Sequence, residues 1–188
     1  MRILTHFRKW WLWPARVAGR LTEGRRCRHH VPVVCNGKGR VVVHDRVSFG
    51  YQLAPRMGNG AVLLQARTPA AVIEIGTRTR LSNNVSIIAC TAVTLGEECL
   101  IGDGVSIMDS DFHRVDPAHR RETPENDAPV SIGRNVWLGN RVMVLKGVSI
   151  GDNSVIAAGA VVTRSIPENC LAAGNPARVI RSIQPPPP

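Results

Sequence analysis

Hydrophobic residues recur at every sixth position through much of this sequence. The longest unbroken run places an aliphatic side chain at each of these positions: Ile132, Leu138, Val144, Ile150, Ile156 and Val162. The next residue is often small, as at Gly133 and Gly139. A period of six matches neither the helical period of 3.6 nor the two-residue alternation of a half-buried strand. It predicts a solenoid in which each unit is a short strand plus a corner, and three units complete one triangular coil.

The same period occurs in two earlier runs, one at Ile75, Leu81 and Ile87 and the other at Leu95, Ile101 and Ile107. We therefore expect an all-β prism over residues 31–183, held together by stacked ladders of Val, Ile and Leu. The period is lost in residues 50–70 and again in residues 108–131. Because the second interruption is rich in charge and proline, we interpret it as a protruding loop. Residues 184–188 are interpreted as a proline tail.

Residues 1–30 differ from the rest in charge. Their eight Lys and Arg against Glu23 give +7 of the chain's net charge of +10. In residues 1–24, apolar residues recur at steps of three and four between arginines, which predicts a basic amphipathic helix interrupted near Pro14. Its apolar face can pack on protein or lie on an anionic membrane surface. No stretch approaches the roughly 18 apolar residues of a membrane-spanning helix, and arginines interrupt any secretory signal.

The five cysteines are scattered and show no C-x-x-C spacing. This pattern indicates neither a disulfide framework nor a zinc site, so no metal is expected. It favours a cytoplasmic protein. If the apolar face of the basic segment lies on lipid, the protein would associate with the inner face of the membrane.

The repeat carries a family resemblance. Residues 132–181, which include W-L-G at 137–139 and N-P-A-R at 175–178, resemble the hexapeptide-repeat acyltransferases. Within them the sequence is most similar to the maltose, galactoside and nodulation-factor O-acetyltransferase group. The resemblance implies a left-handed parallel β-helix, a short C-terminal helix after N-P-A-R, acetyl-CoA as co-substrate, and a homotrimer with its active sites between neighbouring subunits.

His113 is the candidate general base. An imidazole, with an ordinary pKa of about 6.5, can accept a hydroxyl proton at neutral pH and return it to a departing thiolate. In the resembling family the catalytic histidine lies in the extended loop, 24 residues before the tryptophan of a W-x-G element, and His113 precedes Trp137 by that interval. Asp109 and Asp111 can orient the imidazole or be solvated loop charges. Since no G-x-S-x-G nucleophile is present, direct attack without an acyl-enzyme is expected.

The resemblance also assigns the remaining site residues. Trp137 would form one wall of the active-site cleft. Together with Asn84 and Asp111, it would bind the acceptor. The residues assigned to coenzyme A are Gly139, Asn140, Ala158, Thr163, Arg164, Arg178 and Arg181. Two of these roles have structural alternatives, because Ala158 also suits the prism and arginines after the last coil can cap it.

The acceptor positions depart from the family pattern. Where family members have Tyr-x-Asn and, eight residues after that Asn, Asp, this sequence has Arg80-Leu81-Ser82 and Cys90, with Asn83 and Asn84 alongside. Specificity for free galactosides is therefore not carried over. We expect O-acetylation of a sugar or polysaccharide-precursor unit.

Other functions remain open at this point. N-acetylation of an amino-sugar nucleotide and O-acetylation of serine use the same solenoid. A non-catalytic solenoid that binds nucleic acid through its basic segment is an alternative of another class. A metal-dependent hydratase of this architecture needs three ligating histidines, which His113 and His119 do not supply.

Overall fold

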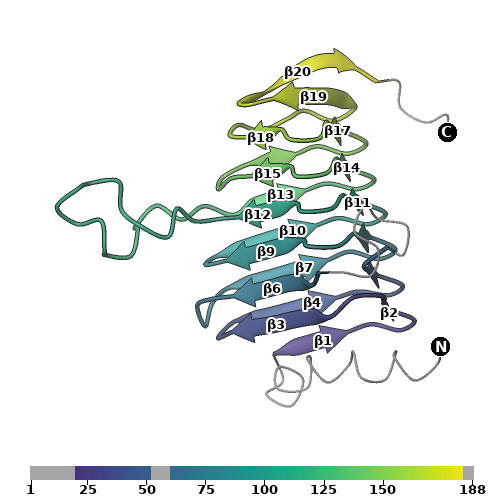
Figure 1. Ribbon diagram of the computed structural model, residues 1–188, viewed down its shortest axis with the longest axis horizontal. Helices are drawn as coiled ribbons and strands as arrows, with labels where there is room; N and C mark the ends of the chain where they lie inside the picture. Colours follow the sequence, from purple (N-terminus) through teal and green to yellow (C-terminus); the bar gives the residue numbers. More distant parts are fainter. Residues whose placement is uncertain (1–19, 52–59, 184–188) are drawn as a thin grey trace.

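The chain winds into a triangular prism of short parallel strands (Figure 1). The computed structural model describes residues 20–51 and 60–183. Successive strands are laid on three faces in turn, and each pairs with strands one coil away in the sequence. The predicted all-β, left-handed parallel β-helix is confirmed.

The three faces of the prism are called A, B and C, and the strands of each follow one another in stacking order. Face A consists of β1 (Leu21–Glu23), β4 (Arg40–Val43), β7 (Val72–Ile75), β10 (Ala92–Leu95), β13 (Val130–Ile132) and β16 (Ser149–Ile150). Face B consists of β2 (Arg28–His29), β5 (Ser48–Phe49), β8 (Arg80–Leu81), β11 (Leu100–Ile101), β14 (Trp137–Leu138), β17 (Val155–Ile156), β19 (Cys170–Gly174) and β20 (Ala177–Ser182). Face C consists of β3 (Val33–Gly37), β6 (Val62–Ala66), β9 (Ser86–Ala89), β12 (Ser106–Met108), β15 (Met143–Val144) and β18 (Val161–Val162).

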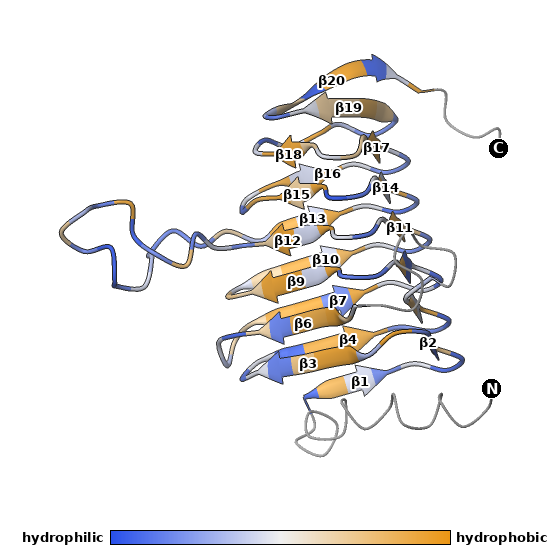
Figure 2. Ribbon diagram, viewed as in Figure 1, coloured by the Kyte–Doolittle hydropathy of each residue, from blue (hydrophilic) through white to orange (hydrophobic). Residues whose placement is uncertain are grey.

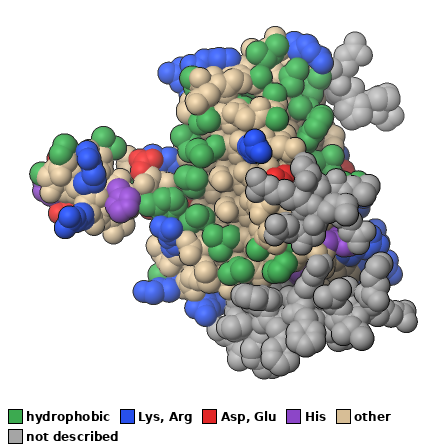
Figure 3. Space-filling model, viewed as in Figure 1, with side chains coloured by type: hydrophobic (Ala, Val, Ile, Leu, Met, Phe, Trp, Pro, Cys, Tyr) green, Lys and Arg blue, Asp and Glu red, His purple; other side chains and the backbone are tan. Residues whose placement is uncertain are grey.

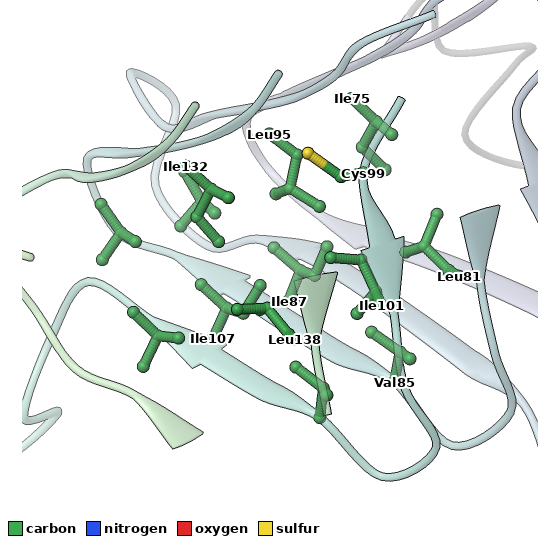
Figure 4. Close-up of a cluster of buried hydrophobic side chains, with 14 of the residues drawn as sticks. Ile75, Leu81, Val85, Ile87, Leu95, Cys99, Ile101, Ile107, Ile132 and Leu138 are labelled. Atoms are coloured by element: carbon green, nitrogen blue, oxygen red, sulfur yellow. The ribbon is translucent and has the colours of Figure 1, made fainter. Parts of the chain in front are cut away.

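The repeating aliphatic residues fill the interior of the prism. All six members of the run from Ile132 to Val162 are buried, as the period predicted. Side chains from the three faces, including Ile87, Ile101 and Ile132, converge on one another (Figure 4). In the two-residue strands the first side chain points outward and the second inward, so Trp137 is exposed whereas Leu138 is buried. Hydropathy follows this division, with apolar strands and a largely hydrophilic protruding loop (Figure 2).

Glycine permits the coils to approach at the edge between faces A and B. A Cβ atom built on Gly76 would lie 2.5 Å from the carbonyl carbon of Gly96, and one on Gly96 would lie 2.6 Å from that of Gly133. Real Cβ atoms do not approach backbone so closely. The small residue after each aliphatic one is therefore a requirement of coil stacking.

The same edge carries one residue per coil in the left-handed backbone conformation. We call these residues the corner column; they are Arg26, Arg46, Arg78, Glu98, Asn135, Asn153 and Asn169, with φ between 53° and 62°. In the last three coils the column is a ladder of amides: Asn135 Nδ2 donates to Asn153 Oδ1, and Asn153 Nδ2 donates to Asn169 Oδ1, each at 3.0 Å. Asparagine tolerates this conformation better than other non-glycine residues.

The prism begins earlier in the sequence than expected. Residues 21–30 belong to the segment of residues 1–30 that the charge pattern assigns to an N-terminal helix, but they contribute β1 and β2 to the first coil. Buried Leu21 and His29 hold them to the core, and their arginines fall at outward and corner positions. The rest of the predicted amphipathic helix, residues 1–19, and the proline tail, residues 184–188, lie outside the described residues.

The predicted C-terminal helix is wrong. After N-P-A-R the chain forms β20, which pairs antiparallel with β19 from Cys170↔Ser182 to Gly174↔Ala177. The edge of the last coil presents unpaired backbone N–H and C=O groups, which a strand can satisfy and a helix cannot. Val179 and Ile180 are β-branched and favour the strand. The described part of the chain contains no helix with the length and hydrophobicity to span a bilayer.

Candidate functional site

A basic cavity lies on face B. Its volume is about 810 Å³, and outward residues of β2, β5, β8, β11 and β14 line it together with residues of the two flanking edges. Trp137, half exposed at 53%, and Asn140 are the predicted site residues that line this cavity. The described residues that line it are Arg26, Arg28, His30, Arg46, Ser48, Gly50, Tyr51, Arg78, Arg80, Leu81, Ser82, Leu100, Ile101, Gly102, Trp137 and Asn140.

The second feature is the protruding loop between β12 and β13. It leaves the prism at the edge between faces C and A and extends away from β11 and β14 (Figure 1). Figure 3 shows basic side chains and histidine on the surface of this loop. Since that edge does not border face B, the loop of one chain and the cavity of the same chain lie on different sides of the prism.

His113 lies in this loop with an exposed side chain, as expected. Its Nδ1 lies 3.1 Å from the carbonyl oxygen of Arg120. A carbonyl can only accept a hydrogen bond, so Nδ1 is the donor in this contact, and in the neutral ring Nε2 is then the nitrogen with the free lone pair. The ring is therefore held in the tautomer that a general base acting through Nε2 requires.

Neither aspartate orients His113 in the structure. Asp109 is fully buried and accepts hydrogen bonds from the N–H groups of Cys90 (2.7 Å) and Thr91 (2.6 Å), and from the Thr91 hydroxyl (2.7 Å). Asp111 is exposed and forms an ion pair with Lys146 at 2.5 Å. Both aspartates therefore anchor the loop, and the backbone carbonyl of Arg120 takes the orienting role.

His119 belongs to a separate pair in the same loop. Its Nδ1 lies 2.7 Å from Asp116 Oδ2, and this hydrogen bond lowers the pKa of Asp116. Both side chains are about half exposed. Within the described loop, His119 is thus tied to a carboxylate, whereas the ring of His113 is held by a backbone carbonyl.

The residues assigned to coenzyme A are spread along the C-terminal coils. Gly139 packs so closely on the next coil that a Cβ atom there would lie 2.6 Å from the Ala158 nitrogen. This contact leaves a flat surface at the edge between faces B and C, beside exposed Ala158. Thr163 and Arg164 are exposed at the other edge of face C, after β18. The structure thus joins Gly139, Asn140 and Ala158 but does not bring Thr163 and Arg164 to them.

The two C-terminal arginines lie on β20. Arg178 Nη1 donates to the Ala177 carbonyl at 2.9 Å, and Arg181 Nη1 donates to that of Ser182 at 3.3 Å. These are local bonds, and both side chains remain exposed. β20 follows β17 and β19 in the strand order of face B, so both arginines lie at the C-terminal end of this face.

Asn84 occupies a turn rather than the cavity wall. Its backbone is left-handed, with φ of 57°, and its Nδ2 donates to Asp103 Oδ1 at 3.2 Å. Its neighbour Asn83 is buried and accepts a hydrogen bond from the Tyr51 N–H through Oδ1. Ser82 and Arg80 line the cavity instead.

Three of the five cysteines are poorly suited to act as nucleophiles. Burial raises the pKa of Cys90 and Cys99, and it raises that of Cys35 to about 11. Thiols with raised pKa stay protonated at neutral pH and are poor nucleophiles. In residues 20–51 and 60–183, no group of three or more His, Cys, Asp or Glu side chains is arranged to hold a metal ion.

The arginines of the cavity were not predicted from the sequence. The basic charge of residues 1–30 was assigned to an N-terminal helical segment, yet Arg26 and Arg28 line the cavity with Arg46, Arg78 and Arg80. The sequence feature that could have predicted this cavity is the recurrence of arginine at equivalent positions of successive coils. The irregular residues 50–70 obscured it because they separate Arg46 from Arg78 in the sequence.

Comparison with known proteins shows what part of this chain is similar to. Residues 129–164 match the model of the bacterial transferase hexapeptide (six repeats). Galactoside O-acetyltransferase of Escherichia coli is 42% identical over 111 residues, which are 59% of this chain and 54% of the relative. This chain thus spans about half the length of the curated relatives it matches.

Two solved structures show the same relationship. A hexapeptide-repeat acetyltransferase of Vibrio cholerae complexed with acetyl coenzyme A is 35% identical, covers 60% of this chain and 61% of its own, and has a TM-score of 0.56. A galactoside acetyltransferase in complex with coenzyme A is 33% identical, covers 83% of this chain and 66% of its own, and also has a TM-score of 0.56. The resemblance to hexapeptide-repeat acetyltransferases is confirmed.

Proposed function

From the hexapeptide-repeat transferase segment at residues 129–164, we propose that this chain transfers an acetyl group from acetyl-CoA to a hydroxyl of a sugar or polysaccharide-precursor unit. Two similar proteins were solved with acetyl-CoA or coenzyme A, and one is a galactoside acetyltransferase. The flat surface at Gly139 and Ala158 suits a slender pantetheine arm, since no side chain obstructs it.

The observation that carries the proposal is the contact between His113 Nδ1 and the Arg120 carbonyl oxygen at 3.1 Å. Because a carbonyl can only accept, Nδ1 is the donor, and Nε2 of the neutral, exposed ring is the atom that can accept a proton. In the reaction, Nε2 accepts the proton of the acceptor hydroxyl as its oxygen attacks the thioester carbonyl carbon. The C–O bond forms, the C–S bond breaks, and the imidazolium returns the proton to the coenzyme A sulfur. No acyl-enzyme is formed, in keeping with the raised pKa of Cys35, Cys90 and Cys99.

A complete site requires a second copy of the chain. His113 extends from the edge between faces C and A, whereas Trp137 and the cavity lie on face B. We propose a homotrimer in which the loop of each protomer reaches the cavity of its neighbour. Closed cyclic assembly satisfies every such contact in the same way.

The proposal is tested by measuring coenzyme A release with a thiol-trapping reagent, with and without sugars, amino sugars and serine. His113→Ala should lower turnover by about two to four orders of magnitude, the effect of a lost general base. His119→Ala is the matched control in the same loop and should retain turnover. Equal activity of the parent and His113→Ala would refute the assigned base, and failure to bind coenzyme A would refute the function.

A further inference from the structure

The charged side chains that line the cavity on face B are positive, so the cavity favours a negatively charged ligand. Its lining contains five arginines and no carboxylate. Arg78 is paired with Glu98 at 2.7 Å, whereas no described acidic residue forms an ion pair with Arg26, Arg28, Arg46 or Arg80. Residues 1–19, 52–59 and 184–188 contain no Asp or Glu. Among the described residues, four of these five arginines therefore form no ion pair with an acidic side chain.

Three of the arginines occupy positions that local preference assigns to another residue. Arg26, Arg46 and Arg78 belong to the corner column, whose C-terminal members are the hydrogen-bonded asparagines. A long side chain is unfavourable in the left-handed conformation, and like charges on adjacent strands repel. Residues that oppose both preferences are typical of functional sites.

The remaining two arginines lie on a straight row that leads to the predicted reaction centre. Strand register places the following outward residues directly beside one another: Arg28, Ser48, Arg80, Leu100 and Trp137. With roughly 4.8 Å between strands, Arg80 lies about 10 Å from Trp137 along the row and Arg28 about 19 Å. The positive surface thus begins near Trp137 and extends toward the N-terminal coils.

The arginines of this surface lie on the opposite side of Trp137 from Ala158 and Arg178, two of the residues assigned to coenzyme A, whereas Asn140, also assigned to it, lines the cavity together with Trp137. Ala158 and Arg178 follow Trp137 toward the C-terminal coils, on or beside β17 to β20. The arginine row instead lies on β2 to β8. The phosphates of coenzyme A therefore have their own basic residues, and the arginine row faces the acceptor.

We propose that the acceptor is an extended acidic glycan, whose carboxylate or phosphate groups bind along the arginines of face B while one hydroxyl lies at Trp137. Guanidinium groups pair with either anion in a two-point geometry. A single neutral sugar would leave the row unoccupied. This inference rests on the proposed acetyl transfer and specifies its substrate class.

The test compares matched acceptors of different charge. Tetragalacturonate carries carboxylates, and its methyl ester is the uncharged equivalent; maltotetraose and phosphorylated maltotetraose form the corresponding phosphate pair. KM for each is measured by coenzyme A release, and direct binding is measured by calorimetry in the absence of acetyl-CoA. One charged acceptor should bind at least about tenfold more tightly than its neutral partner, and added salt should weaken only the charged one.

Two charge-removing variants locate the effect. Arg26→Asn with Arg46→Asn places two asparagines at neighbouring positions of the corner column, where asparagine tolerates the left-handed backbone, so it should raise Tm while it raises KM for the charged acceptor by about tenfold. Arg28→Gln with Arg80→Gln should raise the same KM through the strand positions. Arg141→Asn is the matched control, since Arg141 also has a left-handed backbone, with φ of 58°, but does not line the cavity. KM for acetyl-CoA should not change in any of them.

Several results would overturn the inference. Equal binding of charged and neutral acceptors would remove it, and so would arginine variants that raise KM for acetyl-CoA instead. Preferential binding of a short oligothymidylate would indicate a nucleic-acid surface. Because calorimetry needs no turnover, the inference is decided even if no acetyl transfer occurs, and that failure would count against the proposed function alone.

Discussion

Asp109 ties the base of the protruding loop to the preceding coil through Thr91. One carboxylate oxygen, Oδ2, accepts hydrogen bonds from both the N–H and the hydroxyl of Thr91, while Oδ1 accepts one from the N–H of Cys90. The Asp109 side chain, which accepts all three hydrogen bonds, is fully buried. The loop that carries His113 is therefore attached to the prism by a buried, fully engaged carboxylate.

Substitution of Asp109 by Ala should destabilise the protein by about 3 kcal/mol, because it leaves the buried donors of Cys90 and Thr91 without an acceptor. Urea unfolding measures this difference. Asp111→Ala is the control and should cost about 1 kcal/mol or less, since its ion pair with Lys146 is partly exposed. Similar losses for the two variants would contradict the anchoring role of Asp109.

Complementation between damaged chains should reveal the shared site. His113→Ala and Trp137→Ala should each be inactive alone, because each lacks one half of every site. When the two chains are co-expressed and assemble at random, roughly a quarter of the sites should combine an intact loop with an intact cavity.

Coenzyme A release from the purified mixture measures this recovery. Each variant, expressed and assayed without the other, serves as a control. A mixed trimer that shows no recovery would indicate that both residues act within one chain.

Substitution of Ile150 by Asp should unfold several coils. Ile150 is 2% exposed, pairs in register with Ile132 and forms a bridge to Ile166. An unpaired buried carboxylate there should cost more than about 4 kcal/mol. Ser149→Asp introduces the same charge at the adjacent outward position and should remain folded. Circular dichroism melting separates the two outcomes, and comparable Tm values would count against the stacked-ladder core.

Alkaline pH should weaken the fold through Cys35. Burial raises the pKa of this thiol from 9.0 to about 11, against a smaller opposing effect of Arg20. In the unfolded chain the thiol ionises first, so the free energy of unfolding is unaffected below pH 9 and falls as pH rises toward 11. The loss should reach about 3 kcal/mol.

Denaturant unfolding of the parent and Cys35→Ala at a series of pH values measures this loss. The variant should lose less stability over that interval, even if the smaller side chain lowers its stability uniformly. Parallel curves for the two proteins would exclude a contribution from Cys35.

The interior of the prism could be predicted from the sequence because its cause is local and repeated. Each coil imposes the same demand for an inward aliphatic residue, so the run from Ile132 to Val162 specified its own burial. The end of the prism has no repeat to follow. Val179 and Ile180 form a strand because β19 leaves an unpaired edge, a condition that exists only once the last coil is formed.

The candidate site could be predicted in part for the same reason. Trp137 and Asn140 fall on the repeat, and their place on face B followed from it. The partner that orients His113 is a backbone carbonyl, that of Arg120, which no side-chain pattern marks. The arginine cavity joins Arg28 to Arg80 across an irregular segment, so its extent emerges only when the coils are stacked.

The prism resumes its pairing after the loop as though nothing had intervened: Met108 pairs with Ile88 before it, and Val130 pairs with Val93 after it. Scaffold and reactive group are thus separable modules joined at one corner. Exchange of residues 110–129 between solenoids of this kind would give a direct route to new chemistry on an unchanged frame, provided that the Asp109 carboxylate at the graft point is kept.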